Sequence, residues 1–289
     1  MNVDHDLDFR PARLEDRPAL WAICDRTWGG QDPLKKRLDD FISNPDALLL
    51  CAEHRGRVVG CIIGQWLTPR EAWLGYLRKD PEASVRGLAR AATHAIIERM
   101  RAIEPACTFR GSTSIDQRVQ LHVLPRLGFE EIARRTLWLR PPTDGSPPRR
   151  PVITGDPASW QIRSACVDAI PRLLNLEWTV YERTHDTLRR QFVDRGGWLR
   201  IGPPDAPEAE ALVWRDERYH TVSWLGGDPQ ARLCLLDHVE ADARRCDVPV
   251  AFFLDGSGGG LASALPERGY AIWKAPDAFR LYALRRTGD

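Results

Sequence analysis

One segment decides the fold, and it reads Glu71-Ala72-Trp73-Leu74-Gly75-Tyr76-Leu77-Arg78-Lys79-Asp80-Pro81-Glu82-Ala83-Ser84-Val85-Arg86-Gly87-Leu88-Ala89-Arg90-Ala91-Ala92. Its apolar first half predicts a strand that ends at Asp80-Pro81, and Gly87 with Ala89 begins a predicted helix. The turn between strand and helix offers free N–H groups and a positive helix end to an anion. The segment therefore predicts an anion-binding turn, and an ordinary strand-to-helix turn is an equally good alternative.

The residues on either side predict the rest of the first half. Apolar periodicity and turn residues predict strands at 9–10, 48–53, 58–66, 72–78, 108–112 and 132–139, and helices from 14 to 23 and over 34–42, 87–100 and 117–127. Antiparallel strands come first, and a strand–helix–strand–helix–strand order follows. This order predicts an α/β fold with helices on both faces of one mixed, mostly antiparallel sheet.

The chain is long enough for two domains. It has 289 residues, of which 43% are hydrophobic and 11 are tryptophan, so two cores can be buried. Prolines concentrate between Arg140 and Ser159, where they remove backbone donors and end regular structure. We expect an N-terminal domain at 1–140, a Pro-rich linker at 141–158 and a C-terminal domain at 159–289.

The two halves also resemble each other. Leu124-Pro125-Arg126-Leu127-Gly128-Phe129 is matched near the end of the chain by Leu265-Pro266-Glu267-Arg268-Gly269-Tyr270. Similarly, Trp73-Leu74-Gly75 before Asp80-Pro81 is matched by Trp224-Leu225-Gly226 before Asp228-Pro229. The shared order predicts a tandem duplication.

Composition excludes several functions. The 41 Lys and Arg residues balance 40 Asp and Glu residues, so we expect neither nucleic acid nor a membrane as partner. No window reaches the roughly 18 apolar residues of a membrane span, and the acidic start does not resemble a secretory signal. Seven dispersed cysteines suit a reducing compartment, which favours a cytoplasmic protein. The seven histidines lack metal-binding spacings, so we expect no metal.

The segment that decides the fold resembles the acetyl-CoA binding motif of the GNAT acetyltransferase superfamily. Other stretches fall where that family has them: Phe9-Arg10-Pro11-Ala12, Ala52 to Gly60, and Leu127-Gly128-Phe129-Glu130. Three more are similar to the two-domain branch that includes histidine N-acetyltransferase: Trp28-Gly29-Gly30-Gln31-Asp32, Trp73 to Pro81, and Ser112-Thr113-Ser114. The resemblance implies two tandem GNAT-like domains.

The family resemblance implies where acetyl-CoA, the acyl donor, would bind. It would lie where two central strands separate, with its pyrophosphate on the loop from Ser84 to Ala89 and its carbonyl polarised by N–H groups at the end of the Leu77 strand. The residues expected to bind it are Leu77, Arg78, Lys79, Ser84, Val85, Arg86, Gly87, Leu88, Ala89 and Gln117. A general base must deprotonate the acceptor, because only the neutral amine attacks.

Five positions depart from the family pattern. Ser84 replaces an arginine or glutamine, Lys79 an apolar residue and Gln117 a common asparagine. Leu124 stands where many members carry the tyrosine that protonates the thiolate, and Gly75 stands where the two-domain branch commonly has a glutamate. The usual acid and base would both be absent.

Strand alternation suggests a replacement base. Residues 71, 73, 75 and 77 would share one face of an extended strand, so Glu71 would point the same way as Gly75. Glu71 is the candidate catalytic residue, acting through a water, and Trp73 and Gly75 are candidate substrate-binding residues. The alternative for Glu71 is an ordinary solvated side chain.

The second half departs further. Asp228-Pro229-Gln230-Ala231 forms the equivalent turn without glycine, so we expect this half not to bind CoA but to help shape the acceptor pocket. Trp178, Tyr181 and His185 would form one stripe of a predicted helix, which makes Trp178 and Tyr181 candidate substrate-binding residues, with core packing as the alternative. The glycine-rich loop 256–260 lacks the spacing of a nucleotide-binding or hydrolase motif.

These expectations together predict an acetyl-CoA-dependent N-acetyltransferase that acts on a primary amine of a small molecule, for which an amino acid is one example. The alternative is a catalytically silent acyl-CoA-binding or scaffold protein. A third possibility is a transferase whose acyl donor is longer than acetyl. The protein is expected to be a monomer or a homodimer.

Overall fold

A computed structural model describes residues 6–143, 150–154, 168–203, 205–255 and 259–285. The chain forms two compact units, unit 1 (1–133 and 280–289) and unit 2 (134–279). The C-terminal residues therefore belong to unit 1, whereas the sequence led us to expect domains at 1–140 and 159–289. The difference arises because the last strand of the chain joins the sheet of unit 1, a long-range pairing that no local pattern announces.

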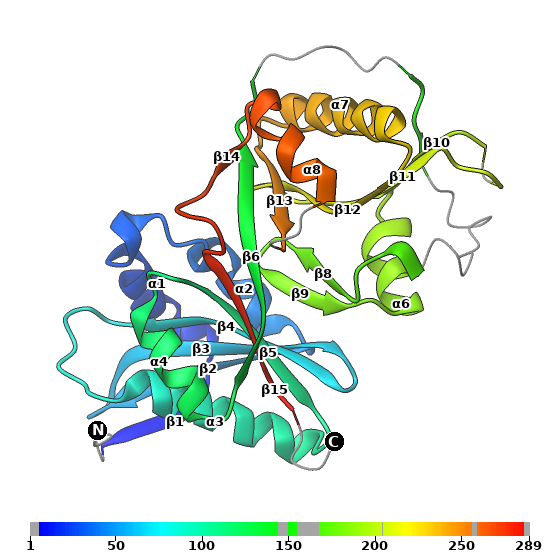
Figure 1. Cartoon of the computed structure of the whole chain (residues 1–289). Helices are drawn as coiled ribbons and strands as arrows, with labels where there is room; N and C mark the ends of the chain where they lie inside the picture. Colours follow the sequence, from blue (N-terminus) through cyan, green and yellow to red (C-terminus); the bar gives the residue numbers. More distant parts are fainter. Residues whose placement is uncertain (1–5, 144–149, 155–167, 204, 256–258, 286–289) are drawn as a thin grey trace. The chain divides into compact units, whose positions relative to one another are not determined.

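Unit 1 is built on a mixed sheet (Figure 1). Its elements are β1 (Leu7–Pro11), η1 (Leu14–Asp16), α1 (Arg17–Asp25), η2 (Trp28–Gly30), α2 (Leu34–Ser43), β2 (Ala47–His54), β3 (Arg57–Thr68), β4 (Glu71–Lys79), α3 (Leu88–Ile103), β5 (Thr108–Ser114), α4 (Arg118–Arg126), the start of β6 (Glu130–Arg140) and most of β15 (Phe279–Leu284). The strand order is β1-β2-β3-β4-β5-β15, then β6. Strands β1 to β4 are antiparallel, and β4 and β5 are parallel.

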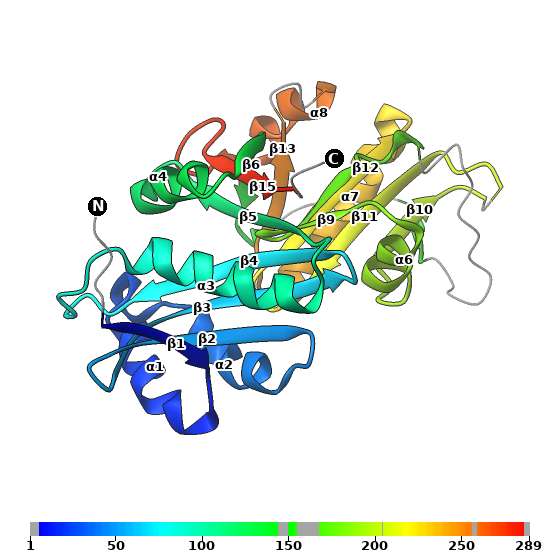
Figure 2. The ribbon, with the colours of Figure 1, turned by 90° about the horizontal axis from the view of Figure 1, so that it is seen from below.

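Helices cover both faces of this sheet, as predicted. Figure 2 shows α1 and α2 on one side of β2–β4 and α3 on the other. Leu20 of α1 and Leu38 of α2 are buried in one core, and Ile96 and Met100 of α3 in another. The predicted strands and helices of the first half are confirmed to within a few residues at their ends, because each has a clear local periodicity.

Unit 2 is a second α/β unit. Its elements are the rest of β6, β7 (Ile153–Thr154), β8 (Leu173–Leu176), β9 (Thr179–Glu182), α6 (His185–Leu188), η3 (Arg189–Val193), β10 (Trp198–Ile201), β11 (Ala209–Arg215), β12 (His220–Gly227), α7 (Pro229–Arg245), β13 (Val250–Leu254), α8 (Gly259–Ala264), η4 (Pro266–Arg268) and β14 (Ala271–Ile272). The strand order is β6-β13-β12-β11-β10-β7, and β14 also pairs with β6. Strands β12 and β13 are parallel, as β4 and β5 are in unit 1.

The repeated sequence runs fold alike. Leu124 and Leu265 each accept a hydrogen bond of 3.1 Å from the backbone N–H five positions later. Gly128 and Gly269 both have left-handed backbones, with φ of 84° and 82°. The two halves therefore build the same helix-to-strand turn, as the predicted duplication requires.

The prediction that Trp178, Tyr181 and His185 lie on one helix is wrong. Residues Leu173–Leu176 and Thr179–Glu182 form the hairpin β8–β9, Trp178 lies in its turn, and a helix begins only at His185. Thr179, Val180 and Tyr181 favour a strand, and Glu177 takes a left-handed conformation with φ of 60° that reverses the chain.

The predicted linker 141–158 is only partly described. Residues 144–149 and 155–158 lie outside the described residues, and Ile153–Thr154 between them pairs with β10. Residues 256–258 of the glycine-rich loop also lie outside the described part of the chain, and α8 begins at Gly259.

Candidate functional site

The turn before α3 has the features of an anion site. Gly87 is the N-cap residue with φ of 75°, and no side chain accepts a hydrogen bond there. The Ala91 N–H donates to the Gly87 carbonyl at 3.0 Å. The N–H groups of Leu88, Ala89 and Arg90 therefore have no acceptor within the helix, and they lie at the positive end of a 16-residue helix.

Strand β4 contains a bulge just before this turn. On β3, Cys61 and Ile63 are two positions apart, whereas their partners on β4, Arg78 and Gly75, are three apart. An extra residue in one strand disrupts the ladder and bends the strand. Tyr76 lies in the bulge with φ of 49°.

The bulge reverses the alternation of side chains, so the expectation that residues 71, 73, 75 and 77 share one face is wrong for Leu77. Leu77 packs against the core that contains Leu74, on the α3 side of the sheet. Tyr76 packs against the core on the α1–α2 side. Leu74 and Leu77, three positions apart, therefore share one face of the sheet, and Tyr76 between them points to the other face.

Strands β4 and β5 separate beyond their first three residue pairs. Residues 71–73 pair with 108–110, yet β4 continues to Lys79 and β5 to Ser114. The later backbone groups on this edge of β4 are not used in pairing with β5. Leu77 lies four residues beyond the last pair, where the family resemblance places the thioester carbonyl.

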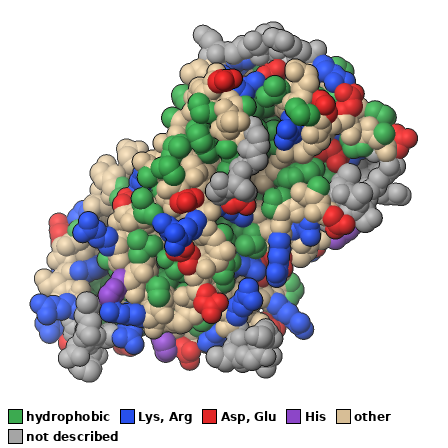
Figure 3. Space-filling model, viewed as in Figure 1, with side chains coloured by type: hydrophobic (Ala, Val, Ile, Leu, Met, Phe, Trp, Pro, Cys, Tyr) green, Lys and Arg blue, Asp and Glu red, His purple; other side chains and the backbone are tan. Residues whose placement is uncertain are grey.

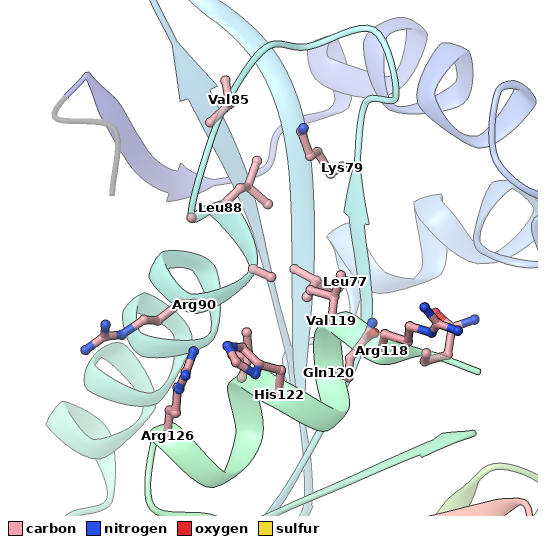
Figure 4. Close-up of a pocket in the computed structure, with 14 residues that line it drawn as sticks. Leu77, Lys79, Val85, Leu88, Arg90, Arg118, Val119, Gln120, His122 and Arg126 are labelled. Atoms are coloured by element: carbon pink, nitrogen blue, oxygen red, sulfur yellow. The ribbon is translucent and has the colours of Figure 1, made fainter. Parts of the chain in front are cut away.

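A cleft of about 830 Å³ opens between these elements and α4 (Figure 4). Its lining includes seven residues that the sequence predicts to bind the donor: Leu77, Lys79, Val85, Gly87, Leu88, Ala89 and Gln117. The other lining residues are Arg90, Arg118, Val119, Gln120, His122, Val123 and Arg126. Figure 4 shows Arg90 on α3 and His122 and Arg126 on α4 around the same part of the cleft.

The cleft fits a coenzyme A thioester. Leu77, Leu88 and Val119 supply apolar walls for the pantetheine arm, and the free N–H groups of α3 suit a pyrophosphate. Arg90 and Arg126 add positive charge for phosphate groups.

The residues of α4 that line the cleft, and Arg90 on α3, were not predicted from the sequence. Residues 119, 122, 123 and 126 follow the i, i+3, i+4, i+7 spacing of one helix face, and that spacing was the available signal. His122 is exposed at the rim of the cleft.

Three predicted donor-binding residues do not line the cleft. The side chains of Ser84 and Arg86 are exposed. The side chain of Arg78 turns to Asp32, with Nε 2.5 Å from Oδ2 and Nη2 2.9 Å from Oδ1. A donor-binding role for these residues through their backbone stays a prediction.

Glu71 lies away from the cleft. It is only 5% exposed, and its carboxylate forms an ion pair with Arg110 on β5, so it is not the solvated side chain of the alternative reading. It precedes Leu77 by six residues, which is about 20 Å along an extended strand, and it lies on the other face of β4. The structure does not bring this carboxylate to the cleft.

Trp73 explains why position 75 is a glycine. The Trp73 side chain is buried, and its Nε1 would lie 3.3 Å from a Cβ at Gly75. A glutamate at that position would press on the indole ring. In unit 2, Gly226 leaves room for Trp224 in the same way. Substrate binding by Trp73 and Gly75 stays a prediction.

The equivalent helix start in unit 2 is closed. The Asp228 carboxylate accepts hydrogen bonds from the N–H groups of Gln230 at 2.9 Å and Ala231 at 3.0 Å. Pro229 occupies the first helical position, where it has no N–H to offer. An incoming phosphate would have to displace a carboxylate of like charge.

The remaining predicted residues, Trp178 and Tyr181, take part in packing within unit 2. The Trp178 ring lies 5.3 Å from that of Trp273 and 5.4 Å from that of Phe279, and Tyr181 packs against the core under β8 and β9. Their substrate-binding role stays a prediction.

Three further observations bear on partners. Among the described residues, no helix is both long and apolar enough to cross a membrane, and no three His, Cys, Asp or Glu side chains are arranged to hold a metal ion. Both basic and acidic side chains occur over the face seen in Figure 3.

Comparison with known proteins agrees with this geometry. Residues 16–129 match the Acetyltransferase (GNAT) family, so unit 1 contains a GNAT acetyltransferase domain. No curated protein sequence matches the chain significantly.

Solved structures resemble the chain over nearly its whole length. A GCN5-related N-acetyltransferase from Sphaerobacter thermophilus has a TM-score of 0.60 at 16% identity, with 99% of this chain and 97% of that one covered. A tandem GNAT protein from the clavulanic acid biosynthesis pathway has a TM-score of 0.58 at 14% identity, with coverage of 98% and 99%. A Pyrococcus horikoshii protein described as an acetyltransferase has a TM-score of 0.59 at 14% identity, with coverage of 99% and 92%. At such identities the likeness shows the fold, which is a tandem GNAT architecture.

Proposed function

We propose that the GNAT domain of unit 1 acetylates a primary amine of a small molecule with acetyl-CoA as donor. One observation carries the proposal: the uncapped start of α3 opens onto a cleft of about 830 Å³ beside the separated ends of β4 and β5. The first feature supplies anion binding, and the second gives access to the unpaired edge of β4.

The roles of the chain's residues follow from their places. The N–H groups of Leu88, Ala89 and Arg90 hold the pyrophosphate, and Leu77 and Val119 contact the pantetheine arm. The backbone N–H groups near Leu77 polarise the carbonyl as charge develops on its oxygen. Acetyl-CoA supplies the acyl group: the amine nitrogen forms a bond to the carbonyl carbon, the C–S bond breaks, and the amine proton ends on the thiol.

The proton transfers involve neither Glu71 nor Leu124 in this proposal. Leu124 is 8% exposed within the core and carries no proton to donate. Glu71 faces Arg110, and we assign it to the ordering of β4 against β5 instead of the catalytic role that the sequence suggested. Solvent that enters the cleft receives the ammonium proton and protonates the thiolate.

Unit 2 is proposed not to bind CoA, and the closed start of α7 supports this. Trp73, Gly75, Trp178 and Tyr181 remain the candidate acceptor contacts. We further propose a cytoplasmic monomer or homodimer; the six described cysteines are all free, as a reducing compartment favours.

The second candidate is a catalytically silent acyl-CoA-binding or scaffold protein, because buried Leu124 and the buried Glu71–Arg110 pair offer no acid or base to the cleft. Thiol release from acetyl-CoA over a panel of primary amines separates the two. Release that depends on an amine supports the transferase, whereas CoA binding without release with any amine supports the silent protein. The same panel with propionyl-CoA and longer thioesters tests the length of the acyl group.

A further inference from the structure

The residue in the β4 bulge lies between two guanidinium groups. The Arg37 guanidinium carbon is 5.9 Å from the centre of the Tyr76 ring, and that of Arg78 is 5.6 Å from it. Nη1 of Arg37 also donates a hydrogen bond of 3.1 Å to the Tyr76 hydroxyl oxygen. Two positive charges therefore meet at one aromatic ring on the α1–α2 side of the sheet.

Only one of these two charges is neutralised. Arg78 is paired with Asp32 at two points, and both side chains are buried. Arg37 is half-buried over the Phe41 ring, 4.7 Å from its centre. No carboxylate in the described part of the chain lies within 4.0 Å of its guanidinium nitrogens.

A half-buried arginine without a carboxylate partner suits an anionic ligand. Removal of the guanidinium from water costs free energy that a carboxylate can offset through charge-assisted, two-point hydrogen bonds. Because the Tyr76 hydroxyl accepts its hydrogen bond from Arg37, its own proton is free to be donated to the same anion.

The position of Tyr76 connects this site to the proposed reaction. Tyr76 and Leu77 are adjacent, with Cα atoms about 3.8 Å apart, and they point to opposite faces of the sheet. The donor cleft lies on the Leu77 side, next to the part of β4 that has no partner in β5. An acceptor that reached the thioester from the opposite side of the sheet would come close to Tyr76.

The loop before α2 adds an open aromatic wall. Trp28 is 55% exposed, and its ring lies over Arg78 with the guanidinium carbon 4.3 Å from the ring centre. Because Arg78 stands between Trp28 and Tyr76, the apolar and the cationic parts of this surface are adjacent.

We propose that Arg37 and the Tyr76 hydroxyl bind a carboxylate of the amine acceptor, so that the substrate class is amino acids or other small amino-carboxylates. This inference rests on the proposed acetyl transfer, and Arg37 acts in it as a specificity-determining residue.

The test compares amino acids with their own carboxamides, which keep the amine and lose the negative charge. Each of a set of L-amino acids and its amide is titrated into protein saturated with CoA, and binding is measured by calorimetry. Turnover is measured separately by thiol release from acetyl-CoA. Three variants are compared with the wild type: Arg37→Met, Arg37→Lys and Arg101→Met. Arg101 is the matched control, since it too lies over a phenyl ring, that of Phe109, 5.5 Å from its centre.

The expected result is at least one amino acid that binds about 10- to 100-fold more tightly than its amide, the range for a hydrogen-bonded charge. Arg37→Met removes this difference, Arg37→Lys keeps part of it, and Arg101→Met leaves it intact. In turnover the loss appears in KM and leaves kcat largely unchanged.

Two results overturn the inference: no amino acid binds better than its amide, or the preference persists in Arg37→Met. Failure of the proposed function gives a different pattern. In that case the amino acid still binds in preference to its amide, but no amine causes thiol release.

Discussion

The Asp228 carboxylate accepts a hydrogen bond from the Ala231 N–H at 3.0 Å and thereby closes the start of α7. At the start of α3, Gly87 has no side chain that could do the same. Together with Pro229, which has no N–H, this difference gives α7 a closed helix start and α3 an open one.

The closed cap predicts how Asp228→Ala behaves. Loss of an N-cap acceptor lowers the free energy of unfolding by about 1 kcal/mol. The CoA affinity should stay at the wild-type value, because the proposed donor site lies in unit 1. Urea unfolding measures the stability, and calorimetric titration with CoA measures the affinity. A weaker CoA affinity in Asp228→Ala would indicate that CoA binds in unit 2 and would contradict the proposed site in unit 1.

The Arg78–Asp32 pair predicts a large effect on stability. Asp32→Asn leaves a buried guanidinium without its counter-charge, and we expect the free energy of unfolding to fall by about 3–5 kcal/mol. Asp25→Asn is the matched control: it removes the Asp25–Lys35 pair, which is exposed, and should cost at most about 1 kcal/mol. Equal effects of the two substitutions in urea unfolding would contradict this account.

The Glu71–Arg110 pair predicts that Glu71→Gln affects folding more than catalysis. Removal of the charge that faces Arg110 should lower the melting temperature by several degrees, and kcat below that temperature should stay within a few-fold of the wild type. Thermal unfolding and thiol release give both values. An unchanged melting temperature with kcat reduced by a hundredfold or more would restore the catalytic role of Glu71.

A buried histidine predicts a pH dependence of stability. Burial lowers the pKa of His220, which is 2% exposed, although the nearby Asp242 opposes that shift. In the unfolded chain the imidazole titrates near 6.5. As the pH falls below 6.5, the unfolded state therefore gains a proton that folded His220 does not take up. The stability falls by at most about 1.4 kcal/mol per pH unit from this group, and the effect vanishes above 6.5.

Urea unfolding at pH 7.5, 6.5 and 5.5 measures this dependence. His220→Gln should flatten the slope between pH 6.5 and 5.5, and His94→Gln, at an exposed site on α3, should keep it. A slope in His220→Gln that equals the wild-type slope would show that other groups cause it.

The sequence predicted the elements of unit 1 well because their signals are local. The residues predicted to bind the donor, from Leu77 to Ala89, lie on one continuous segment, so a single motif located most of that side of the cleft. The fold class follows from the order of the elements, and the matched turns at Leu124 and Leu265 pointed to the second unit.

What sequence reasoning missed depends on contacts between distant residues. The bulge at Tyr76 arises from the register of β4 against β3 and reversed the expected face of Leu77. The pairing of β15 in unit 1 joins the end of the chain to β5. Arg37 carries no motif, and its place beside Tyr76 becomes visible only when α2 packs on the sheet.

The most direct test of the central claim is calorimetric titration of CoA into the wild type and Ala89→Glu, with His94→Glu as control. Ala89→Glu places a carboxylate in the first turn of α3, where negative charge is tolerated by the helix but repels a phosphate. The account predicts one CoA per chain in the wild type and in His94→Glu, and at least tenfold weaker binding in Ala89→Glu. CoA binding that is unchanged in Ala89→Glu, or absent from the wild type at millimolar concentration, would contradict it.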